Sequence, residues 1–135
     1  MASVTRQMLD AYPKSINLDR AKLAAVIDTI NSCAQACTAC ADACLSEEDV
    51  AELTKCVRTD LDCADVCTTT ARVLSRHEGY DANVTRSVLE ACVAACRACG
   101  DECARHAEMH EHCRICADVC RECEQACRDL LAAMS

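Results

Sequence analysis

The chemistry of this chain begins with its sixteen cysteines, a large number for 135 residues. Their spacing alternates between three and four residues, as in the run Cys33, Cys37, Cys40 and Cys44. Residues with this spacing share one face of an α-helix, so the thiols form a stripe where a helical bundle normally keeps leucine and isoleucine. Thiolates are soft metal ligands. The pattern therefore predicts metal binding inside a bundle of helices.

The candidate ligands are the cysteines and the polar residues that continue their stripes. Asp60 stands four residues after Cys56, in the place where a cysteine would complete a Cys-x-x-x-Cys pair. His106 and His110 continue the stripes beyond Cys103 and before Cys113. The predicted metal ligands are Cys33, Cys37, Cys40, Cys44, Cys56, Asp60, Cys63, Cys67, Cys92, Cys96, Cys99, Cys103, His106, His110, Cys113, Cys116, Cys120, Cys123 and Cys127.

The spacing favours Cu(I) over other partners for the thiols. Side chains four residues apart on a helix have Cβ atoms about 5–6 Å apart, whereas a disulfide needs about 3.5–4.5 Å, so a metal ion fits between the sulfurs better. Cu(I) accepts two thiolates, which one helix can supply. Iron–sulfur clusters usually take their cysteines from loops. Zinc needs four ligands, which two helices can supply together, so zinc is disfavoured rather than excluded.

The number of thiols predicts a store of metal rather than a single site. A catalytic site or a sensor needs only a few ligands at one place. If thiolates bridge neighbouring ions, the capacity approaches roughly one Cu(I) per cysteine. We therefore expect a protein that stores and detoxifies Cu(I), binds many of these ions and is not an enzyme. The alternatives are a zinc or general heavy-metal buffer, an iron–sulfur redox protein, and a chaperone that hands copper to one partner.

Composition and charge exclude several other classes of protein. The net charge of −8 argues against nucleic-acid binding, which rewards clustered lysine and arginine. No stretch approaches the roughly 20 apolar residues that span a bilayer, so no membrane partner is expected. The first residues, from Met1 to Met8, lack the apolar run of a signal peptide. We therefore expect a cytoplasmic protein, whose thiols stay reduced and available to metal.

The scarcity of turn-forming residues predicts long helices with short connections. The chain has only two glycines and one proline. A short amphipathic helix is expected over Thr5–Tyr12, within an N-terminal segment of residues 1–17. A cysteine-lined bundle is expected over residues 18–135. Its four helices are expected at Leu18–Cys44, Glu47–His77, Asp81–Ala107 and His110–Ala133.

The expected architecture is all-α, an antiparallel up-down four-helix bundle, because short connections make sequential helices antiparallel. Ser46 is the expected N-cap of the second helix, and Gly79 its C-terminal glycine. Antiparallel stacking then separates two ends of the bundle. An apolar plug gathers Leu23, Val26, Leu74, Leu89, Leu130 and Met134. A metal-binding mouth gathers Cys44, His106, Met109, His110 and Cys113.

The polar residues near the stripes allow more than one interpretation. Asp60 is either a polar break in the stripe or an oxygen ligand. His106 and His110 are either surface histidines around a turn or ligands for incoming Cu(I), and the continuing stripe favours ligands. Met109 is either a soft ligand or a turn residue. His112 lies off the stripe and is expected in solvent.

The array of Cys-x-x-x-Cys motifs between Cys33 and Cys127 resembles the cytosolic copper storage proteins, which are four-helix bundles with cores lined by such motifs. The resemblance implies Cu(I) loaded along the bundle axis, mostly by thiolates, with histidines near the open end. It also implies assembly into a homotetramer. The unpaired Cys56 and Cys113 depart from the repeated motif, which leaves their coordination open.

Overall fold

The computed structural model describes residues 1–134, and every regular element within them is helical. A short helix, α1 (Val4–Ala11), precedes four long ones. The long helices are α2 (Arg20–Leu45), α3 (Thr54–Leu74), α4 (Ala82–Ala104) and α5 (Glu111–Met134), with a 3-10 turn, η1 (Val50–Glu52), before α3. The predicted all-helical fold with a short N-terminal helix is confirmed for these residues.

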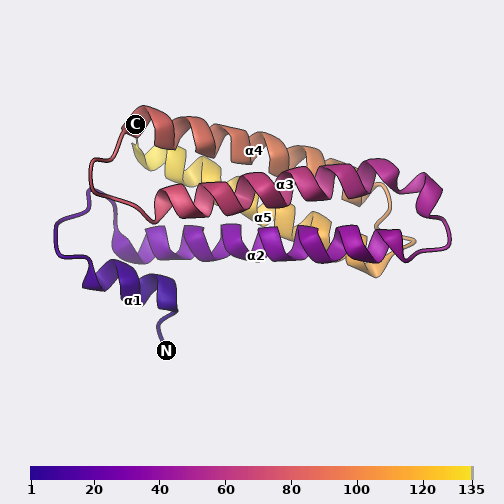
Figure 1. Ribbon diagram of the computed structural model, residues 1–135, viewed down its shortest axis with the longest axis horizontal. Coiled ribbons are helices and arrows are strands. Elements are labelled where there is room, and N and C mark those ends of the chain that lie inside the picture. The colour runs from indigo at the N-terminus through magenta and orange to yellow at the C-terminus, as the bar shows by residue number, and fades with distance from the viewer. Residues whose placement is uncertain (135) are drawn as a thin grey trace.

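The four long helices pack around one shared interior. Helix α2 contacts α3 and α5, and α4 contacts the same two helices, so the four close into a bundle. Figure 1 shows that the α2–α3 and α4–α5 connections lie at one end and the α3–α4 connection at the other. Helix α1 lies against α2 and buries Leu9 there. None of the helices within residues 1–134 has both the length and the apolar character to cross a membrane.

Aspartate side chains mark the starts of two long helices. Asp19 precedes α2 and accepts a hydrogen bond from the backbone N–H of Lys22 at 2.9 Å. Asp81 precedes α4 and accepts from Asn83 at 2.8 Å and from Val84 at 3.2 Å. Each carboxylate satisfies N–H groups that have no partner inside the helix and favours the positive end of the helix dipole.

The start of α3 differs from the prediction. The second long helix begins at Thr54 rather than at Glu47, and Ser46 closes α2 instead of opening α3. The N–H of Ser46 donates to backbone carbonyls of α2, which keeps it in helical geometry at the C-terminus. The acidic segment that follows bends across the end of the bundle, where its carboxylates bind histidines. These distant contacts outweigh the local preference for a helix start.

The end of α3 also differs from the prediction. The helix ends at Leu74, before the expected His77, and Ser75 caps it while its hydroxyl donates to the carbonyl of Ala71. Gly79 lies further along, in the turn towards α4, with a φ of 65° that suits glycine. His77 leaves the helix and packs edge-on against Tyr12 with ring centroids 5.1 Å apart. This contact with the N-terminal segment replaces the last predicted turn.

The interior divides into an apolar end and a thiol-lined length. Leu23, Leu74 and Leu89 of the plug are buried, and they lie near the start of α2, at the end of α3 and in the first half of α4. Val26 is only half-buried, and Ile27 takes the inward position instead. After Ile30, the buried positions of α2 are cysteines or alanine. The predicted separation between a plug and a mouth is therefore present, with one residue changed in α2.

Candidate metal centre

The thiols of the four long helices meet along the interior of the bundle. All sixteen cysteines are free and buried. Sulfur atoms of neighbouring cysteines approach to between 3.5 and 4.0 Å. Pairs that join two helices include Cys37–Cys99, Cys37–Cys120, Cys56–Cys103, Cys63–Cys96 and Cys67–Cys92. The sulfurs therefore form a network across helices, at separations far longer than the roughly 2 Å of a disulfide bond.

The network contains overlapping groups of four potential ligands. Within each group the ligand atoms lie within 4.8 Å of one another. Cys33 of α2 belongs to two such groups, one with Cys37 and one with Cys67. Groups of four thiols include Cys33/Cys63/Cys67/Cys96, Cys33/Cys37/Cys63/Cys120, Cys37/Cys99/Cys116/Cys120 and Cys67/Cys92/Cys96/Cys123. Shared members give thiolates that can bridge ions in adjacent groups.

Asp60 of α3 places a carboxyl among the thiols and is 0 % exposed. Its Oδ1 accepts hydrogen bonds from Cys99 at 2.9 Å and from Cys103 and Cys116 at 3.3 Å. Burial, together with neighbouring thiolates, raises the pKa of Asp60 to about 12. The carboxyl is therefore protonated and neutral at pH 7. It is part of the interior network and not a solvated break in the stripe.

Burial also disfavours charge on the thiols of the mouth. Removal from water raises the pKa of Cys44 and, likewise, that of Cys113. These cysteines therefore hold their protons at neutral pH until a metal ion displaces them. Each thiolate that binds a metal ion must release its proton to solvent, so metal binding competes with protons.

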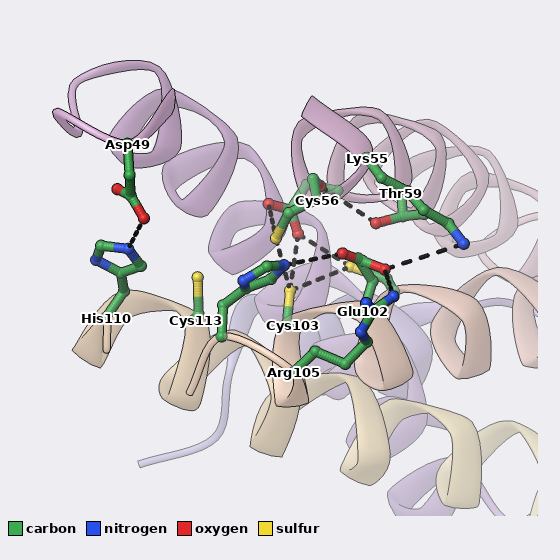
Figure 2. Close-up of polar contacts among 12 residues, drawn as sticks. Asp49, Lys55, Cys56, Thr59, Glu102, Cys103, Arg105, His110 and Cys113 are labelled. Carbon is green, nitrogen blue, oxygen red and sulfur yellow. Dashed lines mark hydrogen bonds and ion pairs between the residues drawn. The ribbon is translucent and has the colours of Figure 1, made fainter. Parts of the chain in front are cut away.

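The mouth pairs two predicted histidines with carboxylates. Figure 2 shows Asp49 directed at His110, with 3.1 Å between Oδ2 and Nε2. That hydrogen bond lowers the pKa of Asp49. His106 makes a 2.9 Å contact through Nε2 with Oε2 of Glu102. Within residues 1–134, neither His106 nor His110 is hydrogen-bonded to a thiol.

Glu102 is a buried acid that the sequence pattern did not select. Its exposed neighbours compensate its charge, with Arg105 at 3.3 Å and Lys55 at 4.0 Å. Figure 2 shows both cations converging on the Glu102 carboxylate beside Cys103. Its position one residue before Cys103, and four before His106, was the available signal. The carboxylate holds the His106 ring at the edge of the thiol network.

His112 is placed differently from the prediction. Its side chain is 25 % exposed, and its Nδ1 lies 3.3 Å from Sγ of Cys40. Nδ1 also lies 3.6 Å from Sγ of Cys113, and these residues form a ligand group with Cys44. The prediction of a solvent position was wrong because His112 stands in the first turn of α5, where contacts with the α2–α3 connection orient the ring. Met109, by contrast, is 72 % exposed in the turn.

The proteins to which this chain is similar are consistent with a metal-binding, thiol-lined interior. A family model described as copper storage protein matches residues 19–132. The chain belongs to the copper storage protein family. It is similar to the copper storage protein Ccsp of Streptomyces lividans loaded with 10 copper equivalents, at 66 % identity, over 96 % of this chain and 98 % of that one, with a TM-score of 0.94.

Two further relatives support the same assignment. One is a structure described as copper loading to a cytosolic copper storage protein from Streptomyces lividans, with five coppers. It is 72 % identical over 83 % of this chain and 93 % of that one, with a TM-score of 0.82. The other is the cysteine-rich protein YhjQ of Bacillus subtilis, 33 % identical over 108 residues, which are 80 % of this chain and 94 % of the relative.

Membership confirms the resemblance inferred from the motifs, the function in copper storage and the binding of many copper ions. In this copper storage protein, the structure brings all the predicted cysteines and Asp60 into one interior. It places His106 and His110 at the mouth against carboxylates. Sequence reasoning missed Glu47, Asp49 and Glu102 as partners of histidines. Acids near the ends of the cysteine stripes were the signal for them.

Proposed function

We propose that this copper storage protein holds its metal as Cu(I), bound by core thiolates, and catalyses no reaction. The observation that carries the proposal is the network of sixteen buried free thiols whose ligand groups share members. Shared thiolates suit Cu(I), which accepts few ligands and lets one sulfur bridge two ions. A water-poor interior protects Cu(I) from exchange and oxidation.

The proposed ligands are the sixteen cysteines together with Asp60, His106 and His110. Each Cu(I) displaces the proton of a thiol, which leaves to solvent. Asp60 gives up its proton in the same way if its Oδ1 binds an ion. His106 has one ring nitrogen in contact with a carboxylate, whereas both ring nitrogens of His110 contact carboxylates, so an ion that binds His110 displaces one of these contacts. They receive incoming ions at the mouth, and the thiols beyond them hold the store.

We further propose an antiparallel up-down bundle that assembles into a homotetramer in the cytoplasm. The alternation of the helix connections between the two ends in Figure 1 supports the up-down order. The tetramer rests on family resemblance, and the location on the relative described as cytosolic. The proposed copper-binding unit is residues 18–135, preceded by a separate segment of residues 1–17. Ser135 lies outside the described residues.

The second candidate function is a zinc or general heavy-metal thiolate buffer. One observation favours it: the four-thiol groups meet the ligand count of a tetrahedral zinc site. Structural zinc sites are closed units with their own ligands, however, whereas Cys33 and its neighbours each serve two groups. Sharing limits the number of complete zinc sites, and it favours the smaller coordination number of Cu(I).

An anaerobic Cu(I) titration of the reduced protein against a chromophoric Cu(I) chelator tests the proposal. Tight uptake approaching about one Cu(I) per cysteine is expected. Saturation after about one to four ions would instead indicate a defined site and contradict the storage core. A parallel competition with zinc separates the second candidate, because a zinc buffer retains zinc when Cu(I) is absent and a chelator is present.

The histidines of the mouth provide a matched test of their separate role. The double variant His106→Ala with His110→Ala is expected to slow uptake and removal of Cu(I), while most of the capacity remains. The thiols that hold the store are intact in this variant. A capacity reduced by about half would contradict a core in which thiolates supply most ligands.

A further inference from the structure

Glu47, in the connection between α2 and α3, contacts two histidines of the mouth at once. Its Oε2 lies 2.8 Å from Nε2 of His112 and 2.8 Å from Nδ1 of His110. The two imidazole rings stack with centroids 5.5 Å apart and planes inclined by 23°. One carboxylate oxygen therefore restrains two rings that would otherwise rotate about their side-chain bonds.

The contact with Glu47 decides which nitrogen of His112 faces the thiols. An ionised carboxylate only accepts hydrogen bonds, so Nε2 of His112 carries the proton that it donates to Glu47. Nδ1 is then the nitrogen nearest sulfur, 3.3 Å from Cys40 and 3.6 Å from Cys113. Metal-binding histidines usually hold their second nitrogen in such a contact, which sets both the tautomer and the orientation of the ring.

We propose that Glu47 is a positioning residue for copper uptake, which orients His112 so that its Nδ1 faces the incoming ion together with Cys40 and Cys113. The proposal rests on the proposed function of the thiols as a Cu(I) store. Glu47 acts through His112 and does not itself touch the ion. It also ties the α2–α3 connection to the first turn of α5, which are 65 residues apart in the chain.

The neighbouring acids have different contacts and provide controls. Asp49 reaches Nε2 of His110, on the side away from Glu47, at 3.1 Å. Glu48 is exposed and contacts neither histidine. The variant Glu47→Ala removes the acceptor, and Glu47→Gln keeps an amide oxygen that accepts a hydrogen bond more weakly. Glu48→Ala removes an equal charge from the same segment, so it controls for the local potential.

The first measurement is the long-range proton–nitrogen NMR spectrum of the histidine side chains in reduced, copper-free protein. The wild type is expected to show a hydrogen-bonded Nε2–H signal for His112. This signal is expected to shift or be lost in Glu47→Ala, to move less in Glu47→Gln, and to stay in Glu48→Ala. An unchanged signal in Glu47→Ala overturns the proposal, whatever the rate of copper uptake in that variant.

The second measurement is the stopped-flow rate of the first Cu(I) uptake from a weak chelator. Glu47→Ala is expected to slow uptake by about tenfold or more, as loss of a ligand-orienting partner does. Partial rescue in Glu47→Gln and an unchanged total capacity are expected. Uptake in Glu47→Ala as fast as in Glu48→Ala overturns the proposal. A low capacity in the wild type contradicts the copper store instead, whereas the copper-free NMR comparison tests Glu47 independently.

Discussion

The buried carboxyl of Asp60 predicts an unusual pH dependence for the stability of the metal-free protein. In the unfolded chain this group titrates near its ordinary value of 3.8, and in the fold its pKa rises to about 12. Folding at neutral pH therefore takes up one proton. Because the folded pKa is the higher one, the contribution of Asp60 to stability is complete below pH 3.8 and is lost progressively as pH rises towards 12.

The size of the effect follows from this single proton. The free energy of unfolding is expected to fall by about 1.4 kcal/mol per pH unit, or about 3 kcal/mol between about pH 5 and pH 7. The variant Asp60→Asn has no proton to take up but keeps an oxygen that accepts from the thiols of Cys99, Cys103 and Cys116. The free energy of unfolding of Asp60→Asn is expected not to fall with pH in this way. At pH 7 it is expected to exceed the free energy of unfolding of the wild type.

Urea unfolding of the reduced, metal-free protein, followed by far-UV circular dichroism, measures this difference. The control is Asp62→Asn, since Asp62 lies on the same helix but is 56 % exposed and paired with Arg58. Titration of the histidines is common to all three proteins, so the difference between their slopes isolates Asp60. Equal slopes for the wild type and Asp60→Asn, between about pH 5 and pH 7, would refute the assignment of a neutral buried carboxyl.

Three further predictions concern the plug, the network and the protons on the thiols. Leu89→Ala removes a fully buried side chain from the plug and is expected to lower the free energy of unfolding, measured in urea titrations, by about 3 kcal/mol. Its control, Val84→Ala at an exposed site of the same helix, is expected to change this free energy by less than about 0.5 kcal/mol. Cys67→Ala removes a sulfur that two ligand groups share. The variant is expected to bind about one Cu(I) ion fewer than the wild type, with unchanged helicity. An undiminished capacity in the chelator titration would show that the network does not hold the metal. Acidification from about pH 8 to pH 6 is expected to weaken Cu(I) retention against a chelator. Burial raises the pKa of Cys44 and Cys113, so protons compete with the metal for their sulfurs. A pH-independent affinity argues against thiolate ligands.

Much of the fold was accessible from the spacing of the cysteines. A period of three and four residues requires a helix if its members are to share a face, and the structure buries each cysteine on such a face. The end of the bundle that holds Leu89 was predicted from the same register. Helix boundaries were less accessible, as the late start of α3 at Thr54 shows. The path of the segment after Ser46 is determined by its contacts with residues far along the chain.

Some features of the candidate site were likewise predictable from the sequence, and others were not. The prediction that the thiols are ligands, with copper as their metal, followed from residue type and local spacing. The surroundings of Asp60 did not, because the three thiols that donate to its Oδ1 come from α4 and α5. The inward position of His112 depends on Glu47, which is 65 residues away. A pattern confined to one helix contains no information on such a pair.

The sequence by itself determined that this protein is a helical bundle with a thiol-lined interior, because helical periodicity is a local property and sulfur chemistry belongs to the residue type. Only the tertiary structure decided which thiols share a ligand group, as Cys33 does with residues of α3, α4 and α5. It also decided which nitrogen of His112 faces sulfur. Both depend on the axial register of four helices and on the path of their connections, which distant contacts set together.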